Sequence, residues 1–72
     1  MFISDLTSAD LRYADLKNAD FQDADLEDAT LVEADLKFAS FSGAIVTDAN
    51  FDDTYWHETM WTDGVRYDTN QA

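Results

Sequence analysis

Large apolar residues recur at every fifth position along most of the chain. Twelve such positions, which we call centres, run from Leu6 to Trp61. Five residues correspond to about 500° in an α-helix, so a helix would scatter the centres around its axis. In a straight strand an odd spacing would place successive centres on opposite faces. Because neither element collects these residues in one core, the pattern predicts a chain that changes direction once per repeat.

Small residues accompany the centres in the same five-residue frame. Nine alanines stand two positions before a centre, at every fifth residue from Ala9 to Ala49. Residues two apart face the same side of a short extended segment, so alanine and centre both point inward. The other three positions are mostly polar and are expected to face water. The predicted core consists of Leu6, Leu11, Leu16, Phe21, Leu26, Leu31, Leu36, Phe41, Val46, Phe51 and Trp56.

A longer period of twenty residues overlies the shorter one. Phe21, Phe41 and Trp61 are aromatic centres at intervals of twenty, and Lys17 and Lys37 show the same interval. Twenty residues are four repeats, which favours a four-sided coil in which each residue stacks on its equivalent one turn later. Twelve repeats then make three turns, and at an inter-strand spacing of about 4.8 Å the stack is roughly 15 Å tall. The predicted inner columns are Leu6–Leu26–Val46, Leu11–Leu31–Phe51, Leu16–Leu36–Trp56 and Phe21–Phe41–Trp61.

The tandem units resemble those of a known repeat family. Successive units read Ala-Asp-Leu-Arg-Tyr at 9–13 and Ala-Asp-Leu-Lys-Asn at 14–18. This resembles the pentapeptide-repeat family, whose pattern is Ala-(Asp/Asn)-Leu-X-X. The resemblance implies an all-β fold, a right-handed quadrilateral parallel β-helix of about three coils. The segment Trp61-Thr62-Asp63-Gly64 is also similar to the ending of some bacterial members.

The length and the departures from the pattern define the domain organisation. Residues 1–72 are expected to form a single domain, with regular repeats over 4–63 and a C-terminal cap or tail over 64–72. Thr54, Thr59 and Gly64 replace the inward alanine. We therefore expect regular coiling to stop near Asp63, with an irregular, aromatic C-terminal end.

The formal net charge of −12 is the strongest feature of the composition. It argues against direct binding to nucleic-acid phosphates, which requires Lys and Arg. Six aspartates directly precede a centre, and the coil would stack Asp5 on Asp25 and Asp15 on Asp35, where like charges repel. One interpretation is that these side chains bond nearby backbone groups and favour the turns. The other is a negative surface that imitates nucleic acid or attracts cations.

No constellation of catalytic or ligand-binding residues is recognisable. The chain has no Cys, and the single histidine, His57, lacks the second histidine four residues on that a zinc-protease helix requires, because that position is Trp61. No nucleophile–base pair or glycine-rich phosphate loop is present. We predict no catalytic residue, no cofactor, no metal site and no enzymatic activity. Weak, diffuse cation binding stays open.

Neither a membrane span nor a signal peptide is expected. No apolar run approaches the eighteen residues that a span requires. The segment Met1–Asp5 lacks the basic and apolar stretches of a signal peptide. The expected location is the cytoplasm, without membrane contact.

Apolar residues at positions that should face water mark a candidate interaction surface. One interpretation is a cap, in which the tail folds over the open end of the coil. The other is a docking surface, most simply for a second copy, because the ends of a coil expose unpaired backbone groups. At the N-terminal end only Met1, Phe2 and Ile3 are available as a cover. The candidate surface consists of Phe38, Tyr55, Met60, Trp61, Val65 and Tyr67.

These observations favour a non-catalytic structural or protein-interaction module. Its partner would be an unidentified protein, and a homodimer through the coil ends is one possible form. The alternative is an acidic DNA mimic that binds a DNA-processing enzyme such as gyrase, as some pentapeptide-repeat proteins do. A coil of roughly 15 Å would imitate only about four or five base pairs.

Overall fold

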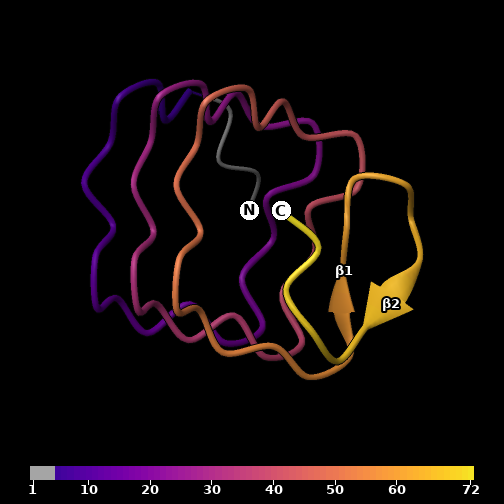
Figure 1. The fold of residues 1–72 in the computed structure, drawn as a ribbon. Coiled ribbons are helices and arrows are strands. Elements are labelled where there is room, and N and C mark those ends of the chain that lie inside the picture. The colour runs from indigo at the N-terminus through magenta and orange to yellow at the C-terminus, as the bar shows by residue number, and fades with distance from the viewer. Residues whose placement is uncertain (1–4) are drawn as a thin grey trace.

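The chain winds into a coil in which each layer pairs with the next. The computed structural model describes residues 5–72, and in this range it contains no helix. Figure 1 shows the successive layers lying side by side, from indigo through magenta to orange. The all-β class is therefore confirmed. Parallel bridges join residues twenty positions apart, and they are Asp5–Asp25, Asp10–Thr30, Asp15–Asp35, Asp20–Ser40, Asp25–Ile45, Thr30–Asn50, Asp35–Tyr55 and Ser40–Met60.

A tight turn after each centre changes the direction of the chain. The backbone N–H of Ala9 donates to the carbonyl of Leu6 over 3.0 Å, and the same bond recurs in later repeats. In the repeats from Ser8 to Glu58 the second residue after the centre has a positive φ, between +47° at Glu58 and +74° at Gly43. A turn of type II requires this conformation, which side-chain-bearing residues adopt only at a cost. The eleven residues are Ser8, Tyr13, Asn18, Asp23, Asp28, Glu33, Phe38, Gly43, Asp48, Asp53 and Glu58.

The core is the stacked interior of the coil. Among the predicted core residues, seven centres are buried, and Leu6, Leu11, Leu16 and Val46 are partly buried against them. The three leucines belong to the first described layer, which has a neighbouring layer on one side only. The buried centres are Phe21, Leu26, Leu31, Leu36, Phe41, Phe51 and Trp56.

The aromatic centres form a continuous stack toward the C-terminal end. The rings of Phe21 and Phe41 are parallel, with centroids 4.8 Å apart. The indole of Trp61 then packs against Phe41, Phe51 and Trp56, with centroid distances of 5.7, 5.2 and 5.2 Å. Offset and edge-to-face contacts of this kind add to the burial energy of the rings. Trp61 thus closes the interior where the coil ends.

Regular pairing gives way to a short hairpin after the last parallel bridge. Strand β1 (Thr59–Met60) pairs antiparallel with β2 (Arg66–Tyr67), at the end of the coil in Figure 1. The last parallel bridge is at Met60, and one further bond between layers joins the N–H of Gly43 to the carbonyl of Thr62 over 3.2 Å. The predicted start of the repeats at residue 4 and the expected N-terminal cover of residues 1–3 lie outside the described residues.

Candidate interaction surface

The C-terminal tail folds back over the last layer of the coil. The carboxylate of Asp63 accepts hydrogen bonds from the backbone N–H of Val65 (3.0 Å) and the hydroxyl of Tyr67 (2.7 Å). The Val65 N–H, and then the Tyr67 hydroxyl, lower the pKa of Asp63 below its ordinary value. The same bond raises the pKa of Tyr67. The hairpin is therefore held by side-chain bonds as well as by its two-residue ladder.

Three further contacts fix the tail to the residues that precede β1. Asp68 accepts the backbone N–H of Glu58 over 2.8 Å, and its carboxylate lies 3.1 Å from Nδ1 of His57. The guanidinium of Arg66 donates to the carbonyl of Glu58 over 2.6 Å. In earlier layers the equivalent N–H donates to a carbonyl of the next layer. Asp68 supplies the acceptor that a further layer would have provided.

The six residues of the candidate surface do not form one surface. Phe38, Tyr55 and Val65 are exposed by 43%, 54% and 50%. Trp61 and Tyr67 are partly buried against the core, in contrast to these three residues. The stacked aromatic interior attracts both rings because burial removes apolar area from water. Met60 is half-buried in β1, where its sulfur lies 3.5 Å from the hydroxyl of Ser40.

An exposed aromatic patch remains on the side of the coil, and we define it as Phe38, Tyr55 and His57. The ring of Phe38 meets the imidazole of His57 edge to face, with centroids 5.3 Å apart. Tyr55 stands two residues before His57 and is stacked on Asp35 by a parallel bridge. The backbone of Phe38 has a φ of +63°, because Phe38 occupies the turn position of its repeat, and its ring is exposed. The patch thus combines residues from two layers.

Positive charge lies close to this patch. Lys17 and Lys37 occupy the same column as His57, and Lys37 Nζ is 3.8 Å from the carboxylate of Asp35. By contrast, the repeats at 4–8, 24–28 and 44–48 contain five carboxylates and no Lys, Arg or His. The aromatic patch therefore stands on the least acidic column of an acidic body.

The aspartates before the centres serve the turns. Each accepts, through Oδ1, the backbone N–H of the residue two positions later, with distances from 3.0 to 3.3 Å. This supports the first interpretation of the acidity for these six positions. At Asp10 the guanidinium of Arg12 adds to the turn bond, and together they lower the pKa of this aspartate. The six are Asp5, Asp10, Asp15, Asp20, Asp25 and Asp35.

Two threonines that replace inward alanines have roles that sequence reasoning missed. Thr59 is fully buried, and its hydroxyl donates to the carbonyl of Leu36 over 2.7 Å. The hydroxyl of Thr54 donates to the carbonyl of Phe51 (2.8 Å) and accepts the indole N–H of Trp56 (2.7 Å). The sequence contained a signal for these bonds, namely threonine at a position that faces the core, because a buried hydroxyl needs a hydrogen-bond partner.

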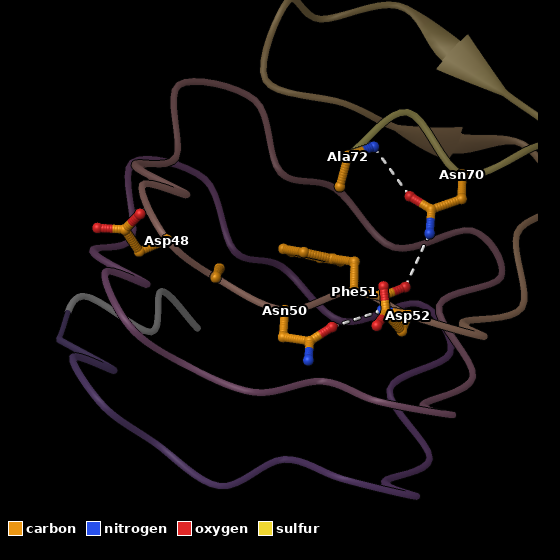
Figure 2. Close-up of a pocket in the computed structure, with 7 residues that line it drawn as sticks. Asp48, Asn50, Phe51, Asp52, Asn70 and Ala72 are labelled. Atoms are coloured by element: carbon orange, nitrogen blue, oxygen red, sulfur yellow. Dashed lines mark hydrogen bonds between the residues drawn. The ribbon is translucent and has the colours of Figure 1, made fainter.

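A cavity of about 280 Å³ lies between the last layer and the tail. Phe51 lines it, and the tail contributes Asn70, whose side-chain amide donates to the carbonyl of Phe51 over 2.7 Å. Figure 2 shows Asn70 and Ala72 on one side of the cavity and Asn50 and Asp52 on the other. Most of the side chains that line the cavity are polar, and they are Asp48, Asn50, Asp52 and Asn70.

Comparison with known proteins agrees with the five-residue geometry. The model of the family described as pentapeptide repeats matches residues 4–23 and 19–55, with eight copies of the repeat. The chain belongs to the pentapeptide-repeat family. No match to a curated protein or to a solved structure was found. The resemblance of the repeats is thereby confirmed.

The pentapeptide repeats and the C-terminal features meet at a defined boundary. The family match ends at residue 55, so His57, the β1–β2 hairpin and the tail lie beyond it. Within residues 5–72 no group of three or more His, Cys, Asp or Glu side chains is placed to hold a metal ion. The described part of the chain also contains no helix of sufficient length and apolar character to cross a membrane.

Proposed function

We propose that this pentapeptide-repeat chain is a non-catalytic module that binds another protein through its aromatic patch. The observation that carries the proposal is the edge-to-face contact of exposed Phe38 with His57, with exposed Tyr55 two residues before His57, on the least acidic column of the body. Aromatic side chains at interfaces supply large contact areas at a small cost in conformational entropy. The acidic remainder of the surface would repel other copies and disfavour wrong partners.

The scaffold that we propose for this patch is a right-handed, four-sided β-helix of three coils. The bridges at intervals of twenty residues support it, because twenty residues contain four repeats and four turns. In such a scaffold each side presents three stacked strands, and residues at equivalent positions form straight columns. The patch residues would then project from adjacent positions of a rigid surface.

The repeat itself offers substitutions that test the patch without disturbing the fold. Phe38→Asn copies Asn18, which occupies the same turn position one layer earlier with a φ of +64°. Tyr55→Asp copies Asp35, the residue on which Tyr55 is stacked. Tyr13→Asn is the matched control, because Tyr13 is 71% exposed at the same turn position but lies in another column.

The experiment compares proteins captured from a lysate of the native organism by immobilised chains. A partner that binds the patch should be captured by the wild-type chain and by Tyr13→Asn, and lost with the Phe38→Asn/Tyr55→Asp double variant. Interface aromatics of this kind cost about 2 kcal/mol or more when removed, which reduces binding at least tenfold. Capture that survives in the double variant would contradict the proposal, provided that circular dichroism shows the coil intact.

Imitation of nucleic acid is the second candidate, and no observation favours it over the first. Six of the carboxylates are engaged in turns. The longest dimension of the molecule is 25 Å. At about 3.4 Å per base pair this length corresponds to roughly seven base pairs. A gyrase supercoiling assay tests this candidate, which requires inhibition or protection of the enzyme by the wild-type chain.

A further inference from the structure

Within residues 5–72, the repeat at 49–53 in the last layer lacks the partner strand that the equivalent repeats of earlier layers have. In the layer before, Leu31 N–H donates to Asn50 O over 2.7 Å, and Glu33 N–H donates to Asp52 O over 3.0 Å. The carbonyl of Ala29 accepts the N–H of Asn50 over 2.9 Å. These three bonds join each repeat to the equivalent repeat of the next layer.

The same groups in residues 49–53 have no such partner. Within residues 5–72, no acceptor is placed opposite the N–H groups of Phe51 and Asp53, and no donor opposite the carbonyl of Ala49. Unpaired edges of this kind readily accept another extended chain. The tail meets the following repeat, where Asp68 binds the N–H of Glu58, but it does not complete the edge at 49–53.

The cavity lies directly on this edge. It is lined by Ala49 and Phe51 at its apolar floor, and the tail residues Asn70 and Ala72 stand across it, as Figure 2 shows. The ring of Phe51 is 2% exposed and packs against Trp61, so the apolar part of the lining that an added chain could reach is Ala49. The space is therefore bounded by an unpaired backbone edge, the small apolar side chain of Ala49 and polar side chains.

Charge indicates which chain would occupy the cavity. Asp48 and Asp52 line it, and both are exposed. Within residues 5–72 the carboxylate of Asp52 makes no hydrogen bond or ion pair, in contrast to the turn-bonded aspartates before the centres. Side chains of an added strand alternate, so one set would face the side on which Ala49 lies, while the other would stand beside Asn50 and Asp52.

We propose that the edge at 49–53 binds an extended peptide segment of a partner protein in which apolar and basic residues alternate. The peptide adds as a further parallel strand. Its carbonyls accept the N–H groups of Phe51 and Asp53, and one of its N–H groups donates to the carbonyl of Ala49. An apolar side chain packs on Ala49, and a lysine or arginine lies beside Asp52. Strand addition to an open sheet edge is an established mode of peptide recognition.

The probe is the fluorescent peptide acetyl-Lys-Ala-Lys-Leu-Lys-amide, titrated against the full chain at low salt. Asp52→Lys should weaken binding about five- to tenfold, because one exposed attraction is replaced by a repulsion of similar size. Glu27→Lys is the matched control, because Glu27 is an exposed acid at the same repeat position in another column, and it should leave binding within about twofold. Peptide N-methylated at the central lysine should bind more weakly, since that N–H meets Ala49.

Hydrogen exchange separates strand addition from simple charge attraction. The amides of Phe51 and Asp53 should gain protection when the peptide is added, and those of the first layer should not. Equal weakening by Asp52→Lys and Glu27→Lys would show attraction to the acidic body alone and overturn the proposal. Absence of binding would also overturn it. Protection that rises with protein concentration in the absence of peptide would assign the edge to a second copy instead.

The inference rests on the proposed function as a protein-interaction module, but its site is distinct from the aromatic patch. The Phe38→Asn/Tyr55→Asp double variant should bind the peptide as the wild-type chain does. Asp52→Lys should retain any partner captured through the patch. Loss of peptide binding in the double variant would overturn the assignment to the edge, whereas failure of patch-dependent capture alone would overturn only the proposed function.

Discussion

Two leucines in one column provide a direct measure of how the coil is stabilised. Leu16 and Leu36 occupy equivalent positions in successive layers, with Trp56 completing the column. Leu36 is fully buried, whereas Leu16 is only partly buried in the first described layer. We predict that Leu36→Ala destabilises the protein about twice as strongly as Leu16→Ala. The chemistry of the two substitutions is identical, so the difference reports the number of neighbouring layers.

The magnitude follows from burial and from the size of the protein. A fully buried Leu→Ala substitution costs about 2–5 kcal/mol, including the cavity that it leaves. A leucine with one neighbouring layer should lose about half of this, roughly 1–2.5 kcal/mol. A domain of 72 residues has a net stability of about 4–11 kcal/mol. Leu36→Ala therefore removes a large part of the total, and it should lower Tm by about 10–30 °C.

The assay is urea denaturation of the wild-type chain and both variants, followed by far-ultraviolet circular dichroism. Tryptophan fluorescence gives a second probe, because Trp56 and Trp61 both lie at the C-terminal end of the coil. Coincident transitions from the two probes would justify a two-state comparison. Equal losses for Leu16→Ala and Leu36→Ala would refute the reasoning. Such a result would show that Leu16 is covered as completely as Leu36 in solution.

Three further predictions concern the turns and the charges. Gly43→Ala and Gly64→Ala should each cost about 1–2 kcal/mol, because both glycines have positive φ; Gly43→Ala should cost slightly more, since its Cβ would displace the flexible, exposed carboxylate of Asp23, and thermal melts give the difference. Asp63→Asn should be destabilising near neutral pH. Folding lowers the pKa of Asp63, so its carboxylate stabilises the folded protein fully at pH values above the ordinary pKa of aspartate, and this stabilisation is lost as the pH falls through the pKa of the folded state. The difference in Tm between the wild-type chain and Asp63→Asn should therefore narrow toward pH 2. A difference in Tm that does not change with pH would contradict this. Asp25→Asn keeps an oxygen that accepts the N–H of Glu27 in the turn, and it removes one charge from the stacked pair Asp5 and Asp25. The free energy of unfolding should therefore rise by less than about 1 kcal/mol at low salt, and this gain should be absent in about 1 M salt.

The periodic part of the sequence was sufficient to predict the coil. A five-residue step is incompatible with one face of a helix or a straight strand, so a turn in every repeat was the only way to collect the centres. The observed bridges at twenty-residue intervals follow from the spacing of Phe21, Phe41 and Trp61. The prediction worked because each layer repeats the same local contacts, and neighbouring layers alone determine the packing.

The positions of side chains near the C-terminus could not be obtained in the same way. Sequence reasoning grouped Trp61 and Tyr67 with Phe38 and Tyr55 in one candidate surface, although it also placed Trp61 in an inner column. Only the three-dimensional structure separates the two pairs. Trp61 packs against Phe41, as its place in the inner column predicts, whereas Tyr67 reaches the core from β2, which pairs antiparallel with β1. Pairing between residues 59 and 67 depends on tail contacts that have no period.

The sequence by itself therefore determined the repeating coil, its inward columns of leucine and alanine, and the use of aspartate at the turns, because these depend on local, repeated interactions. The tertiary structure decided which aromatic residues are exposed and where the coil lacks a partner strand. One example is the contact between Phe38 and His57, which joins two layers. Another is the hydrogen bond from the N–H of Glu58 to Asp68, which joins the last layer to the tail. Such contacts occur once in the chain, and a periodic pattern contains no information about an interaction that does not repeat.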